Sequence, residues 1–304
     1  MIYMNILDNS SNLYAAYDLP TRQFDLEKWK LYMDRLLPGA KDICLADLKE
    51  GLDSGLLWEK DYLPVLNAVL SNPEAVRETV SSFHQVTDTL EEKVLSGFGR
   101  TVDVDIILYL GLCSGAGWVT SVDGRMSILL GIEKILELNW SGSDAMNGLI
   151  LHELGHIYQS QYGVLKRDLT APEDRFLWQL FTEGVAMTFE QMVVGSFEYF
   201  HEDVNGWKAW CDAKEKHIAD SFNHDLPHMD RSNQRYFGDW VRFEGHPDTG
   251  YYLGARFIQF ILRQDTFDHV ISYDMPTVRN AFEEFLISLS SAAFGMSDGQ
   301  GTEI

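Results

Sequence analysis

The chain has 304 residues, 45% of them hydrophobic and 12% aromatic, which is enough for a globular protein of one or two domains. Lys and Arg total 24 against 46 Asp and Glu, so the formal net charge is −22. A surface this acidic repels phosphate backbones and anionic lipids, so we expect neither a nucleic-acid partner nor a membrane partner.

Cysteine usage indicates a reducing compartment. Cys44, Cys113 and Cys211 are widely spaced and form no C-x-x-C pair, so we expect no disulfide framework. Residues 1–8 lack the basic start and the apolar run of a signal peptide. The apolar stretches are interrupted well short of the roughly 18 residues that a spanning helix needs. We therefore expect a cytoplasmic protein.

Residues 1–100 are predicted to form a helical N-terminal region of unknown role. Apolar residues recur at three- and four-residue spacing in 24–33, 61–70 and 74–83. Pro73 is well placed to open the last of these helices, because proline is favoured in the first turn.

A small sheet is predicted after residue 101. The alternation in 102–110 is typical of a strand, and a Gly- and Ser-rich loop follows. Two further apolar runs, 118–122 and 125–131, flank the dipeptide Asp123-Gly124. This dipeptide favours a two-residue hairpin turn. A hairpin therefore precedes the next helix.

The rest of the chain is mainly helical, so the predicted class is α+β. Helices are expected at 144–162, 173–194 and near 207–220, 252–264 and 276–293. The expected organisation is therefore a helical N-terminal region at 1–100, a domain at 101–296 and a frayed tail at 297–304.

The helix at 144–162 contains the motif H-E-x-x-H, as His152, Glu153 and His156. Histidines four apart on a helix point the same way, so both imidazoles can bind one metal ion, here Zn²⁺. Glu153 can then reach a water on that ion and take its proton. Three apolar residues of the helix are expected to face the core: Leu151, Leu154 and Ile157. The alternative is a surface helix with two histidines and an incidental glutamate.

Glu183 is the best candidate for a third ligand. It follows His156 by 27 positions (183 − 156) and lies on the next predicted helix. A catalytic zinc has three protein ligands and one open position. The small residues Gly184 and Ala186 beside it would let the two helices approach closely. Glu190, two turns further on, is a weaker candidate, and an exposed helix glutamate is the alternative for Glu183.

These motifs resemble those of the gluzincin branch of the zincin-like metallopeptidases. H-E-L-G-H followed by E-G-V-A is similar to segments of the uncharacterised bacterial predicted zinc-dependent proteases and, more distantly, of the M1-type aminopeptidases. The resemblance covers about residues 100–265. It implies a zincin-like fold, with the hairpin at the sheet edge packed on the metal helix and the edge strand along the substrate cleft. It also implies that Glu183 is the third ligand.

Residues 250–256, G-Y-Y-L-G-A-R, resemble the Y-x-x-G-A segment of that clan, whose tyrosine stabilises the oxyanion. This register implies Tyr251 in that role, with Tyr252 as the fallback. The alternative is an aromatic pair that packs at a helix start. His246 is a further candidate electrophile. His224 and His228 flank Pro227, which argues against a helical two-histidine site there.

Two features depart from the family pattern. The G-x-M-E-N segment that binds a substrate N-terminus is absent, since 130–134 reads L-G-I-E-K. The acidic residue expected four positions after the third ligand is replaced by Met187. The carboxylate or amide that orients a ligand histidine must then come from elsewhere. The candidates for that role are Asp144, Asn147 and Asp174.

The resemblance implies a zinc-dependent peptidase that acts on a peptide or protein substrate, with Glu153 as the general base. Two alternatives stay open. One is a zinc-dependent hydrolase of a non-peptide amide or ester. The other is a zinc-retaining binding or chaperone-like protein without catalysis, although a structural zinc site has no use for Glu153.

Overall fold

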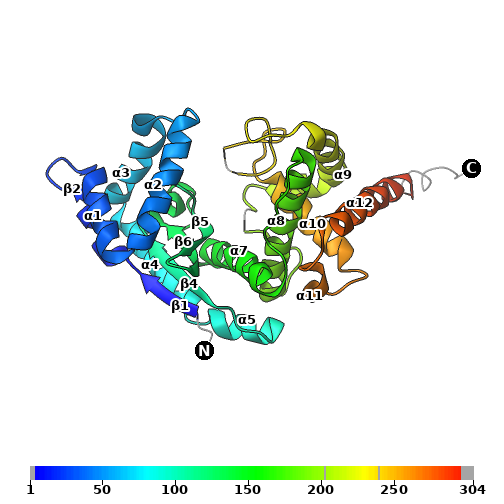
Figure 1. The fold of residues 1–304 in the computed structure, drawn as a ribbon, viewed down its shortest axis with the longest axis horizontal. Coiled ribbons are helices and arrows are strands. Elements are labelled where there is room, and N and C mark those ends of the chain that lie inside the picture. Colours follow the sequence, from blue (N-terminus) through cyan, green and yellow to red (C-terminus); the bar gives the residue numbers. More distant parts are fainter. Residues whose placement is uncertain (1–3, 202, 239, 296–304) are drawn as a thin grey trace, which may run out of the picture. The chain divides into compact units, whose positions relative to one another are not determined.

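The structure is a computed structural model that describes residues 4–201, 203–238 and 240–295 (Figure 1). It is α+β, mainly helical with one small mixed sheet. The chain divides into two compact units, residues 1–157 and 158–304. The boundary lies inside helix α7 (Ser143–Tyr162). The tail expected at 297–304 lies outside the described residues.

The first unit holds the sheet. Its strands are β1 (Met4–Asp8), β4 (Val104–Tyr109), β5 (Gly117–Val122) and β6 (Arg125–Gly131). Its helices are α1 (Leu26–Leu36), α2 (Pro38–Asp53), α3 (Leu63–Ser71), α4 (Pro73–Thr87), α5 (Leu90–Phe98) and α6 (Ile132–Glu137). A 3-10 helix (Ser10–Ala16), a short ribbon of β2 (Tyr17–Asp18) with β3 (Gln23–Phe24) and a π-helical turn (Trp58–Tyr62) complete the unit.

The sheet has the strand order β1-β4-β6-β5. β1 and β4 pair in parallel with Met4 opposite Val104, and β4 and β6 are also parallel. The inner strands β4 and β6 are buried over most of their length, whereas β1 and β5 alternate or stay partly exposed. β1 joins residues near the start of the chain to this sheet through its parallel pairing with β4. The helices before β4 and the sheet form one unit.

The predicted hairpin is present as β5 and β6, which pair antiparallel with Trp118 opposite Leu129. Its turn is Asp123-Gly124, with φ values of 50° and 82°. Positive φ at both central residues matches the right-handed twist of the flanking strands and explains the Asp-Gly pair. β5 forms one edge of the sheet.

Helix α1 anchors the carboxyl end of β4 through two aromatic side chains. Trp29 Nε1 donates to the Leu110 carbonyl at 2.9 Å, and the Leu110 N–H donates to the Tyr32 hydroxyl at 3.1 Å. Both aromatic residues are buried. These two bonds pair the carbonyl and the N–H of Leu110, the residue after the strand. Buried backbone groups need such partners because water cannot reach them.

The second unit is helical. It contains the last turn of α7 and the helices α8 (Pro172–Val194), α9 (Trp207–Asp225), α10 (Thr249–Ile261), α11 (Phe267–Val270) and α12 (Met275–Gly295), with a 3-10 turn at Leu226–His228. α9 therefore ends before Pro227, as expected. No helix in the described part of the chain has the length and apolar character that crossing a membrane requires.

Helices α8 and α10 lie side by side (Figure 1). Their backbones are in contact at Gly184 and Gly254. A Cβ on Gly184 would overlap the Gly254 carbonyl, and a Cβ on Gly254 would lie 2.6 Å from the Leu180 carbonyl. Two glycines at one crossing bring the helix axes closer than any larger residues allow. The sequence led us to expect that Gly184 makes room for the metal helix. Its nearest neighbours are instead atoms of α10.

Candidate metal centre

Helix α7 presents the H-E-x-x-H motif on one side and apolar residues on the other. Leu151, Leu154 and Ile157 are completely buried, as expected for the core side. His152 and Glu153 are also buried, with 6% and 8% exposure, and His156 is partly exposed. The two imidazole rings lie edge to face, with centroids 4.9 Å apart and planes at 88°. One turn of helix therefore sets both rings side by side.

Glu183 occupies an unusual place on α8. From Leu180 to Gln191 the helix is buried at every position except Glu183, which is partly exposed. A helix that is apolar around most of its circumference is normally a core helix. Glu183 is the one partly exposed residue in this buried stretch. Solvation of an exposed helix face therefore does not explain why a carboxylate is there.

The structure brings the three predicted ligands together. His152, His156 and Glu183 each offer one ligand atom, and these atoms all lie within 4.8 Å of one another. Ligand atoms about 2.1 Å from one tetrahedral zinc lie roughly 3.4 Å apart, so side-chain rotation is enough to gather them around one ion. Two imidazoles and one carboxylate are also a donor set that catalytic zinc uses. The residues present therefore fit the ion that the motif predicts.

Glu153 lies against the first residue of the edge strand β5. A Cβ built on Gly117 would be 2.9 Å from Glu153 Cγ and 3.1 Å from its Oε1. The same Cβ would be 2.9 Å from Leu149 Cδ1, one turn earlier on α7. Contacts this short are too close for real Cβ atoms, so glycine at 117 is what lets the strand reach the carboxylate. The general-base candidate and the sheet edge are thus direct neighbours.

A second buried glutamate organises the loop that leads into β5. Glu133, 1% exposed, accepts the Gly111 N–H at 2.8 Å and the Cys113 N–H at 3.0 Å. Burial raises the pKa of this carboxyl, and the two backbone donors oppose the rise. Glu133 belongs to residues 130–134, L-G-I-E-K, where the G-x-M-E-N pattern that binds a substrate N-terminus is absent. Its contacts are with the loop backbone, so it has a structural task.

The two tyrosines differ in their surroundings. Tyr252 is fully buried, and its hydroxyl donates to Asp212 Oδ1 at 2.8 Å. Its ring packs on Phe200, with centroids 5.6 Å apart. Tyr251 is half-buried in the first turn of α10, with its ring edge-on to Phe237 at 5.9 Å. Tyr252 therefore has the contacts of a core residue, and Tyr251 is the better candidate for contact with a substrate.

The other candidates have local roles. Asp174 forms an ion pair with Arg279, and Asp144 is exposed two turns before His152. His246 stacks on Trp210, with ring centroids 3.9 Å apart. The two histidines around Pro227, His224 and His228, are both exposed.

Gly117 and Glu133 are the residues that sequence reasoning missed. The signal for Gly117 was its position, because it closes a run of small residues just before a strand. Glu133 gave no local signal, since its partners are backbone groups about 20 positions earlier.

Comparison with protein-family models, with curated proteins and with solved structures gives no match for this chain.

Proposed function

We propose that this protein is a zinc-dependent peptidase of the gluzincin type with a zincin-like fold. His152, His156 and Glu183 would hold Zn²⁺. When bound, the ion would supply Lewis acidity that lowers the pKa of water to about 7 and polarises the substrate carbonyl. The proximity of these three ligand atoms is the observation that carries the proposal.

The remaining chemistry falls to residues of this chain. Glu153 accepts a proton from the attacking water and passes it to the leaving amine. Its burial keeps bulk water away from the carboxylate and strengthens its interactions. The Tyr251 hydroxyl donates a hydrogen bond to the oxygen where negative charge develops. The free edge of β5 pairs with an extended peptide, as sheet edges do in strand addition.

The test begins with metal content. Mass spectrometry on the purified protein should find about one zinc per chain, and Glu183→Ala should hold far less because one of three ligands is lost. Glu173→Ala, a partly exposed glutamate in the first turn of the same helix, is the matched control and should keep the metal. Wild-type protein that takes up no stoichiometric zinc when metal is supplied would refute the site.

Activity is then measured on quenched fluorescent peptide libraries. Glu153→Gln should keep its zinc and lose turnover by a factor of about 10²–10⁴, the usual contribution of a general base. Turnover of small amides or esters without peptide cleavage would instead favour the non-peptide hydrolase. A zinc-loaded protein that turns over neither class of substrate would favour the binding function.

A further inference from the structure

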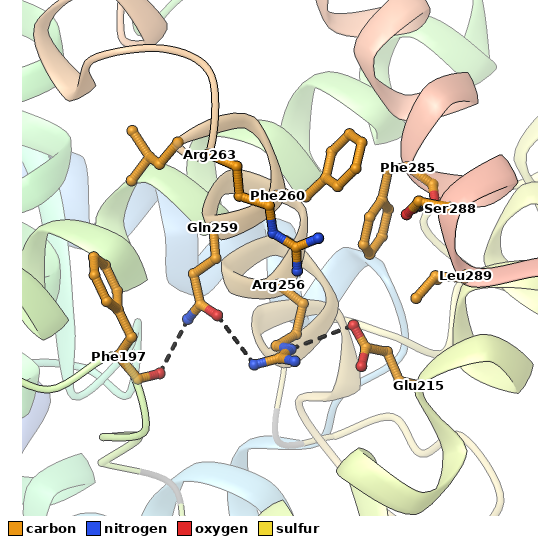
Figure 2. Close-up of a pocket in the computed structure, with 10 residues that line it drawn as sticks. Phe197, Glu215, Arg256, Gln259, Phe260, Arg263, Phe285, Ser288 and Leu289 are labelled. Carbon is orange, nitrogen blue, oxygen red and sulfur yellow. Dashed lines mark hydrogen bonds and ion pairs between the residues drawn. The ribbon is translucent and has the colours of Figure 1, made fainter. Parts of the chain in front are cut away.

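A cavity of about 540 Å³ lies in the second unit, and its lining includes none of the three proposed metal ligands. It is formed by α10, α12, Glu215 of α9 and Phe197 of the loop after α8 (Figure 2). Its walls are largely apolar: Phe197, Phe260, Leu262, Phe285 and Leu289. Two of its ten lining residues are arginines and only one is acidic. Because Glu215 and Glu198 both pair with Arg256, Arg263 supplies the positive charge of the lining that is not balanced by a carboxylate.

Arg256 is fixed in place by neighbouring side chains. Its Nε donates to Glu215 Oε1 at 3.3 Å, and its Nη1 donates to Gln259 Oε1 at 3.1 Å. The same Nη1 also pairs with Glu198 Oε1 at 3.8 Å, so two carboxylates balance the charge of Arg256. Gln259 in turn donates to the Phe197 carbonyl at 3.0 Å. Figure 2 shows this chain of contacts from Phe197 through Gln259 and Arg256 to Glu215. A guanidinium that is already oriented loses little entropy when it binds a further group.

Arg263 lies in the turn just after α10 and extends into the same cavity (Figure 2). Its guanidinium lies 5.6 Å from the centroid of the Phe260 ring. It forms no ion pair with any residue that the structure describes. The side chain is exposed, so its charge is available at the cavity mouth.

We propose that this cavity binds a small organic anion, in which a carboxylate is joined to an aromatic or branched apolar body. The planar fork of a guanidinium matches a carboxylate, and the Arg263 guanidinium just after α10 gives the cavity its preference for an anion. The phenylalanine walls take the apolar body, as in most small-molecule sites. Phe197 is 46% exposed, and such a ligand would cover part of this side chain.

The test uses benzoate as the probe and benzamide as its neutral counterpart of the same shape. Binding is measured by ligand-observed NMR titration at fixed ionic strength. We expect saturable benzoate binding at least tenfold tighter than that of benzamide. Arg263→Gln should weaken benzoate about tenfold, since one charge-assisted pair is lost. Arg242→Gln, an exposed arginine outside the cavity, is the matched control and should bind benzoate like the wild type.

A second variant tests the location without removing charge. Ser288→Trp places a large ring in the cavity and should abolish benzoate binding, with the thermal midpoint checked in parallel. Equal affinity for benzamide and benzoate would overturn the anion preference. Benzoate binding that survives both Arg263→Gln and Ser288→Trp would place the ligand elsewhere, at the metal ligands for example. Benzoate binding that does not saturate up to about ten millimolar would also overturn the proposal. Such binding would have a free energy of only a few kcal/mol.

Discussion

Gly117 leaves no room for a side chain beside Glu153. Gly117→Ala forces either the strand or the glutamate to move, and overpacking of this kind costs about 1–3 kcal/mol in the free energy of unfolding. Because the carboxylate would shift, under the proposed function we expect peptide turnover to fall by about tenfold or more while zinc content stays unchanged. Chemical denaturation, metal analysis and turnover together check this prediction.

The matched control is Gly97→Ala, since a Cβ at Gly97, in the exposed helix α5, also meets nothing within 4 Å. This variant should keep wild-type turnover and lose no stability. Equal behaviour of the two alanine variants would mean that the contact between Gly117 and Glu153 does not constrain the site.

Glu133 predicts a specific pH dependence of stability. Burial raises the pKa of its carboxyl above the unfolded value of 4.5. The protonated form is therefore favoured by folding, so the group's stabilising contribution is full below the unfolded pKa. It is lost as pH rises through the folded pKa. Glu133→Gln cannot titrate and should remove this dependence.

The measurement compares free energies of unfolding of the wild type and Glu133→Gln at several pH values from about 4 to 8, spanning the window above the reference pKa. The difference, wild type minus variant, should fall as pH rises. Subtraction cancels the other carboxylates of the chain. A difference that is flat or that grows with pH would show that the backbone donors Gly111 and Cys113 outweigh the cost of burial.

At the scale of elements, the crossing of α8 and α10 depends on Gly184 and Gly254. Gly184→Ala introduces a methyl group into the other helix's backbone, so we expect a loss of about 1–3 kcal/mol. Gly97→Ala is the matched change, since Gly97 is exposed in α5 with open space around it. It should gain about 0.5 kcal/mol from helix propensity and a less flexible unfolded chain. Thermal or denaturant unfolding distinguishes the two. A neutral Gly184→Ala would contradict the close crossing.

Elements with a strong local pattern could be predicted from the sequence. The β5–β6 hairpin follows from Asp123-Gly124, and α7 and α8 follow from apolar spacing. β1 could not be predicted, because five residues carry little periodicity and its partner is a hundred positions away. The partner of Gly184 was also beyond sequence reasoning. A glycine in a helix indicates that another backbone comes close, but it does not identify which one.

The same distinction applies to the site. One helical turn dictates that His152 and His156 share a side, so their pairing could be predicted from spacing alone. Glu183 needed the family resemblance as well. The choice between Tyr251 and Tyr252 depended on tertiary contacts, since only the structure reveals the bond from Tyr252 to Asp212.

At the scale of the whole molecule, the charge of −22 predicts how salt affects substrate preference. An acidic protein attracts cationic ligands over distances of about 10 Å at 0.1 M salt, and salt screens this attraction. Under the proposed function, kcat/KM for a lysine-flanked peptide should exceed that for its glutamate-flanked counterpart by about tenfold at low salt. The gap should narrow toward 0.5 M salt. A neutral peptide serves as the control, and a salt-independent gap would indicate recognition by direct contacts instead.

The parallel pairing of β1 with β4 also orders events in time. Met4 finds Val104 only after the five α-helices between the two strands have been synthesised. Until then residues 4–8 have no strand to join, whereas each helix can form from local contacts. Long-range parallel pairing is intrinsically slow, so closure of this edge should be a late step of folding. Until this edge closes, the unpaired side of β4 would be the surface most in need of protection from other chains.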